Sequence, residues 1–146
     1  NTPWFGIWTV NATQGLESQQ TAVVMESKWA AINPSWSPDG RRILFATVYK
    51  GTEAKASGSL FYADDIWVVN RNGDNQQQIT NNKYPEWNPF WEDNGRIYFN
   101  RNVSGKKNLW SIKPRLVAVP GTEAAEDQDK PDDKPEDYAG DYYICR

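Results

Sequence analysis

The sequence predicts an all-β protein built on a repeated unit of about fifty residues. A turn motif between two apolar runs occurs early in the chain and recurs downstream. Short segments in which large apolar residues alternate occur three times. The 146 residues include eight Trp, seven Tyr and five Phe, far more aromatic surface than a disordered chain carries. We therefore expect one folded domain with a true core.

The first element is a hairpin in residues 33–47, which read Asn-Pro-Ser-Trp-Ser-Pro-Asp-Gly-Arg-Arg-Ile-Leu-Phe-Ala-Thr. Pro38 presets φ for a turn, Asp39 can accept a hydrogen bond from its own backbone, and Gly40 adopts positive φ without steric cost. A tight turn between two apolar runs predicts an antiparallel hairpin. We assign Pro38, Asp39 and Gly40 a structural role in that turn.

The hairpin has a second copy about fifty residues downstream. Pro34, Trp36 and Pro38 match Pro85, Trp87 and Pro89 at a shift of 51 residues, and residues 40–45 match residues 95–99. This alignment inserts residues 90–92 into the second turn. An alternating apolar motif, Ile-Trp-Thr-Val, Ile-Trp-Val-Val and Leu-Trp-Ser-Ile, appears at residues 7–10, 66–69 and 109–112. A fifty-residue unit of four short antiparallel strands is typical of a β-propeller blade.

These motifs resemble the TolB-like propeller repeat. The quoted pattern is Trp-Ser-Pro-Asp-Gly, a strand with Ile and Phe, then Asp-Ile-Trp-Val-Val-Asn, Asn-Gly and Ile-Thr. The resemblance covers residues 33–80 almost throughout, residues 84–113 well, and residues 5–24 as the second half of a blade. It implies that the turn joins the first two strands of a blade and that the Ile-Trp pair lies on the third.

We accordingly predict a partial β-propeller of about two to three four-stranded antiparallel blades with an extended acidic C-terminal tail. Residues 1–120 form the blades, as a half blade (1–25), a blade (30–80) and a blade (84–119). Residues 121–139 form an acidic linker, and nine acids against two lysines give residues 122–141 a net charge of −7. Residues 140–146 are a candidate terminal strand, because Gly-Asp-Tyr-Tyr-Ile-Cys-Arg resembles residues 95–101.

Two to three blades are too few to close a ring, since propellers typically need about four to eight. We expect further blades in a longer polypeptide. The alternatives are that copies of this chain assemble into a ring or that another protein covers the open face.

The composition argues against catalysis by this segment. The chain has no His, one cysteine at position 145 and no nucleophile motif, which excludes Ser-His-Asp and Cys-His catalysis and His-ligated metals. The acid pairs at residues 64–65 and 92–93 fit turn chemistry better than paired-carboxylate hydrolysis. We predict no catalytic residues, no cofactor and no metal. The sequence has no dense cluster of basic residues of the kind that binds nucleic acid, so we predict no nucleic-acid partner. No apolar run reaches the roughly 18 residues of a membrane span.

Four aromatic side chains are candidate partner contacts, because they lie on predicted loops without repeat counterparts: Phe61, Tyr62, Phe90 and Trp91. The alternative is that each loop folds its own aromatics onto the rim. Tryptophans at repeat positions instead predict packing between blades.

We expect a non-catalytic scaffold that mediates protein–protein interaction within a larger assembly, with proteins or further blades as partners. The extracytoplasmic location, periplasmic or secreted, is implied by the resemblance alone. Two alternatives stay open. In the first alternative the chain is the non-catalytic propeller segment of a longer hydrolase or redox enzyme. In the second, copies of the chain form an oligomeric ring that binds sugars between blades.

Overall fold

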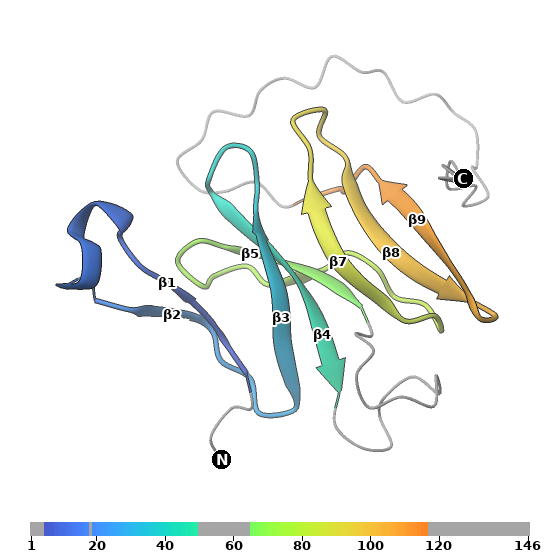
Figure 1. Cartoon of the computed structure of the whole chain (residues 1–146), viewed down its shortest axis with the longest axis horizontal. Coiled ribbons are helices and arrows are strands. Elements are labelled where there is room, and N and C mark those ends of the chain that lie inside the picture. The colour runs from blue at the N-terminus through green and yellow to red at the C-terminus, as the bar shows by residue number, and fades with distance from the viewer. Residues whose placement is uncertain (1–4, 18, 50–64, 117–146) are drawn as a thin grey trace.

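The computed structural model describes residues 5–17, 19–49 and 65–116, which form three antiparallel sheets side by side (Figure 1). A half blade pairs β1 (Ile7–Thr9) with β2 (Thr21–Val24), and the 3₁₀-helix η1 (Ala12–Glu17) lies between them. The central blade has the strand order β3 (Trp29–Trp36), β4 (Arg42–Tyr49), β5 (Ile66–Asn70) and β6 (Gln77–Gln78). The second blade has the order β7 (Glu86–Trp91), β8 (Ile97–Val103) and β9 (Lys106–Ile112). The predicted all-β class is confirmed.

The central blade buries both of its faces. Successive side chains of a strand point to opposite faces, and β4 is apolar on each. Leu44, Ala46 and Val48 pack toward the second blade, in one cluster with Ile97 and Phe99. Ile43 and Phe45 pack on the other face with Ile7, Val23 and Val24 of the half blade. The core therefore consists of two layers, one on each side of the central blade.

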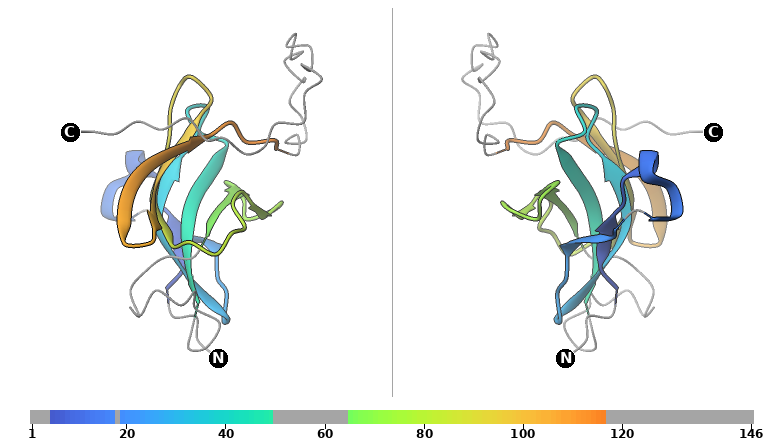
Figure 2. Two further views of the ribbon diagram at one scale, coloured as in Figure 1. Left: turned by 90° about the vertical axis from the view of Figure 1, so that its right-hand side faces the viewer. Right: turned by 90° about the vertical axis from the view of Figure 1, so that its left-hand side faces the viewer.

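The second blade stacks on the central one through its first strand. β7 lies against β3 and β4, and the two side views show the second blade beside the central blade (Figure 2). In the described residues the second blade has three strands, and residues 117–119 of its predicted range lie outside the described part. The predicted linker and terminal strand, residues 121–146, lie outside it as well.

The repeat alignment at a shift of 51 residues is wrong. Each blade has a bulge in its first strand, where the register shifts between Ile32 and Ser35 and between Trp87 and Phe90. Asn33 and Asn88 occupy these bulges with φ of 51° and 50°. Asparagine tolerates this left-handed conformation better than most residues.

The bulges align Asn33-Pro34 with Asn88-Pro89, and therefore Trp36 with Trp91. Trp36 pairs with Ile43, and Trp91 pairs in the same way with Ile97. The second turn has no insertion and is one residue shorter, because Glu92 N–H donates to the Arg96 carbonyl, whereas Ser37 N–H reaches Arg42. Pro85 misled the sequence alignment, since it produces a second Pro-x-Trp pattern four residues before the true one.

Candidate functional site

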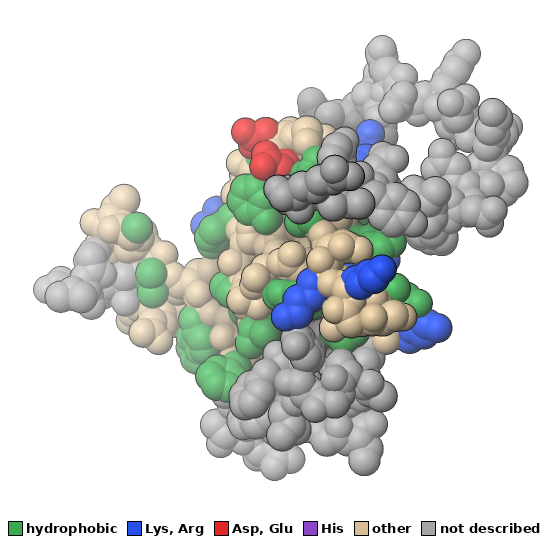
Figure 3. Space-filling view, turned by 45° about the vertical axis from the view of Figure 1, so that its right-hand side comes forward, with side chains coloured by type: hydrophobic (Ala, Val, Ile, Leu, Met, Phe, Trp, Pro, Cys, Tyr) green, Lys and Arg blue, Asp and Glu red, His purple; other side chains and the backbone are tan. Residues whose placement is uncertain are grey.

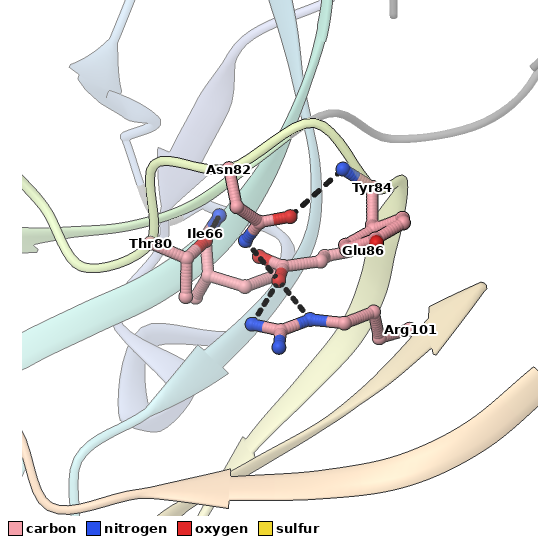
Figure 4. Close-up of polar contacts among 6 residues, drawn as sticks. All are labelled: Ile66, Thr80, Asn82, Tyr84, Glu86 and Arg101. Carbon is pink, nitrogen blue, oxygen red and sulfur yellow. Dashed lines mark hydrogen bonds and ion pairs between the residues drawn. The ribbon is translucent and has the colours of Figure 1, made fainter. Parts of the chain in front are cut away.

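A buried polar network joins the central and second blades (Figure 4). The Glu86 side chain is fully buried, and its Oε1 accepts hydrogen bonds from Asn82 Nδ2 at 2.7 Å and from Arg101 Nε at 2.6 Å. Arg101 Nη2 lies 2.5 Å from the same oxygen. The Arg101 guanidinium also stacks 4.4 Å from the Trp110 ring centroid. The hydroxyl of Thr80 accepts from the Ile66 N–H beside this carboxyl.

Burial raises the pKa of the Glu86 carboxyl above its ordinary value, although hydrogen bonds from Thr80 and Asn82 and the charge of Arg101 act in the opposite direction. Glu86 and Arg101 occupy the positions that Ala31 and Thr47 hold in the central blade, as the strand pairing shows. The network is thus a polar variant of the packing between blades. A carboxylate this deeply enclosed has no access to a substrate, so the network serves structure.

The predicted turn residues lie in a tightly bonded turn. Gly40 has φ of 66°, and the Asp39 carboxylate accepts from Ser37 Oγ at 2.6 Å and from Arg41 N–H at 3.0 Å. Pro38 lies in the same turn, between β3 and β4. Partial burial opposes ionisation of Asp39, but these hydrogen bonds and the charges of Arg41 and Arg42 outweigh it and lower its pKa.

Two of the candidate partner contacts lie on a strand. Phe90 and Trp91 belong to β7, so their expected place in an inserted turn is wrong. Trp91 packs on the core between the blades, whereas Phe90 is 52% exposed. Phe61 and Tyr62 lie outside the described residues, and so does Asp64 of the first acid pair. The four side chains are therefore not brought together in the part that the structure describes.

An exposed apolar surface lies instead on the half blade. Four large side chains on or beside β1 and β2 are exposed: Phe5 (61%), Val10 (60%), Trp8 (49%) and Met25 (43%). We call these four residues the half-blade surface. Hydrophobic side chains reach the surface in several places over the described part of the molecule (Figure 3).

The repeat explains why Trp8 is open. Its counterparts on the third strands are Trp67, which lies 5.7 Å from the Trp29 ring, and Trp110, which Arg101 covers. Trp29 comes from the first strand of its own blade. The half blade has no first or second strand in the described residues, and β1 pairs only with β2 there. The motif at residues 7–10 could have predicted this exposure, because it marks the third strand of a blade, and a third strand normally has a first and a second strand beside it.

Metal-binding and membrane features are absent from the described part. Residues 5–17, 19–49 and 65–116 contain no group of three His, Cys, Asp or Glu side chains that could hold a metal ion. Within the same ranges, no helix has the length and apolar character needed to cross a bilayer.

Comparison with known proteins identifies the fold. No family model and no curated protein matches the chain. A solved structure described as "putative TolB from Agrobacterium tumefaciens" is similar at a TM-score of 0.55 and 18% sequence identity. The match covers 77% of this chain and 39% of that one. The chain thus has the antiparallel all-β fold of part of a TolB propeller, as its repeats predicted.

Proposed function

We propose that this chain is a non-catalytic β-propeller scaffold that binds protein through its half-blade surface. The observation that carries the proposal is the exposure of Trp8 and Met25, whose side chains both lie close to Gly6, with Phe5 and Val10 exposed on the same segment. Contiguous apolar surface beside an open strand edge is costly in water and favours pairing with another polypeptide. The face that the central blade presents to its own neighbour is, by contrast, covered.

The strand edge adds a second attraction. β1 has β2 on one side, and its other edge is open among the described residues. An extended segment that paired there would satisfy the backbone groups of β1 and cover Trp8. Further blades of a longer polypeptide and a separate protein both supply such a strand. We place the assembly outside the cytoplasm, a proposal that rests on the likeness to TolB.

Site-specific photo-crosslinking tests the proposal. A photoreactive amino acid replaces Trp8, and in a matched variant it replaces Leu109, which is 37% exposed on β9. We expect position 8 to yield a discrete protein adduct, or a crosslink to another part of the same polypeptide, on irradiation of the native assembly. Position 109 should yield neither. Equal labelling from both positions, or none from position 8, would refute the proposal.

A further inference from the structure

A groove opens at the end of the molecule where η1 faces the central blade. It has a volume of about 720 Å³, and its walls come from the β1–η1–β2 segment on one side and from Trp36 and Arg71 on the other. This volume lies within the roughly 300–1,000 Å³ range of small-molecule sites. The groove is on the side of the half blade that faces the central blade, since Thr9 in its wall shares a strand face with buried Ile7.

The groove exists because η1 replaces a tight turn. Residues 10–20 join β1 to β2, whereas only residues 71–76 join the matching strands β5 and β6. That shorter connection closes with a hydrogen bond from Gly73 N–H to the Asn70 carbonyl. The longer segment holds one wall of the groove away from the central blade.

Trp36 is exposed in this groove although its counterpart is not. Trp91 holds the same place in the second blade and packs on the core between blades. Trp36 is 48% exposed. A large indole left half in water is free to bind an apolar face of a ligand. Packing between blades therefore explains the presence of a tryptophan at position 91, but it does not explain the exposed indole at position 36.

Apart from Trp36, Val10 and Ala12, the groove side chains are hydrogen-bonding groups, and none carries a negative charge. Hydroxyl and amide groups come from Thr9, Thr21, Gln14 and Gln19, and no Asp or Glu lines the groove. The Arg71 side chain is the only charge among the lining residues, and it forms no ion pair with any residue that the structure describes. The groove is thus positive, and its neutral donors and acceptors are matched to a hydroxyl-rich ligand.

We propose that this groove binds an acidic saccharide, with a pyranose ring against Trp36 and its carboxylate on Arg71. A guanidinium pairs with a carboxylate through two parallel hydrogen bonds. The C–H face of a pyranose suits an indole, and its hydroxyls suit the amides and threonines. The groove is too small to be the binding site of a folded protein by itself, because stable protein interfaces bury about 1,200 Å² or more in total. This inference is distinct from the proposed protein-binding role, because Val10 is the only residue of the half-blade surface that also lines the groove, and Phe5, Trp8 and Met25 lie outside its lining.

The test compares methyl β-D-glucuronide with methyl β-D-glucoside, which differ only at C6, where the glucoside has a hydroxymethyl group in place of the carboxylate. Ligand-observed NMR titrations on the whole chain measure both affinities. We expect millimolar binding of the glucuronide and at least about tenfold weaker binding of the glucoside, because the charged bidentate pair is lost. Arg71→Gln should weaken the glucuronide by about tenfold and leave the glucoside unchanged.

Trp36→Ala should weaken both sugars by at least about tenfold, since it removes the stacking surface. Phe90→Ala is the matched control, because Phe90 is a similarly exposed aromatic on β7 that lies outside the groove lining, and it should leave both affinities unchanged. A thermal melt verifies that each variant folds, and Arg71→Gln decides the matter if Trp36→Ala does not. The proposal is overturned if the glucuronide fails to bind at about 20 mM, if Arg71→Gln leaves its affinity unchanged, or if an acidic hexapeptide binds more tightly than the glucuronide.

Discussion

Replacing Arg101 by Met should destabilise the protein far more than its partial exposure suggests. Glu86 is completely buried and Arg101 is 17% exposed, with 2.5 Å between Arg101 Nη2 and Glu86 Oε1. Two unit charges about 4 Å apart attract each other by about 4 kcal/mol at an effective dielectric constant of about 20. Loss of one partner leaves a buried charge uncompensated and typically costs about 3–5 kcal/mol. We expect Arg101→Met to lower the free energy of unfolding at pH 7 by that amount.

The deficit should depend on pH because Glu86 can take up a proton. Its folded-state pKa is raised, so the folded protein binds this proton more tightly than the unfolded chain does. The contribution of Glu86 to the free energy of unfolding therefore rises as pH falls through the folded-state pKa, and it is complete below the ordinary value of 4.5. Without Arg101 the folded-state pKa rises further. The deficit of Arg101→Met should then be smaller at pH 5 than at pH 7.

Urea unfolding followed by tryptophan fluorescence measures these differences as shifts of the midpoint. Arg115→Met, at an exposed arginine, is the matched control and should stay within about 0.5 kcal/mol of the wild type. Replacing Glu86 by Leu together with Arg101 by Met should restore most of the lost stability, because an apolar pair of similar volume avoids the buried charge. A loss below about 1 kcal/mol, or a deficit that does not change with pH, would refute this reasoning.

Three further predictions use the same unfolding assay. Asp39→Ala should lower the free energy of unfolding by about 1 kcal/mol, because the turn loses the hydrogen bonds to this carboxylate. Because the pKa of Asp39 is lowered in the folded state, the stabilisation by the wild-type residue is present above pH 3.8 and is lost as pH falls through the folded-state pKa. Gly40→Ala should lower the free energy of unfolding by about 1 kcal/mol, because the φ of +66° at this position strains a residue that has a Cβ. Gly6→Ala should lower it by more, because a Cβ on Gly6 would lie 2.5 Å from a backbone oxygen of β2. Phe45→Ala should cost about 3–5 kcal/mol and Phe90→Ser under about 0.5 kcal/mol, because the first side chain is fully buried and the second 52% exposed; equal losses would contradict the assignment of the core.

Local chemistry made the hairpin predictable. Pro38, Asp39 and Gly40 specify a turn through their own backbone preferences, and the alternating Ile-Trp motif specifies a strand through its period of two. The bulges were not predictable in the same way. Asn33 and Asn88 favour the left-handed conformation only weakly, and the misleading proline at position 85 offered a more conspicuous alignment.

The contacts between blades required the three-dimensional structure. Glu86 and Arg101 are opposite each other across β7 and β8, and Asn82 reaches them from the connection between blades. No sequence period marks such a set. The open groove was also hidden, because Trp36 belongs to a repeat position that predicts packing, and only the length of the segment around η1 exposes it.

The two open sides of the described array differ in chemistry. Ile97 and Phe99 of β8 face the central blade, so the residues alternating with them face outward. The outward positions of the second blade are mostly polar where the central blade is apolar: Tyr98, Asn100, Asn102 and Ser111 replace Leu44, Ala46, Val48 and Val68. The half-blade surface is instead apolar, with Phe5 and Val10 about 60% exposed. Covering the polar side removes little apolar surface from water, whereas covering the apolar side removes more and therefore gains more free energy. Association of this chain with another strand or protein should therefore begin at the half blade.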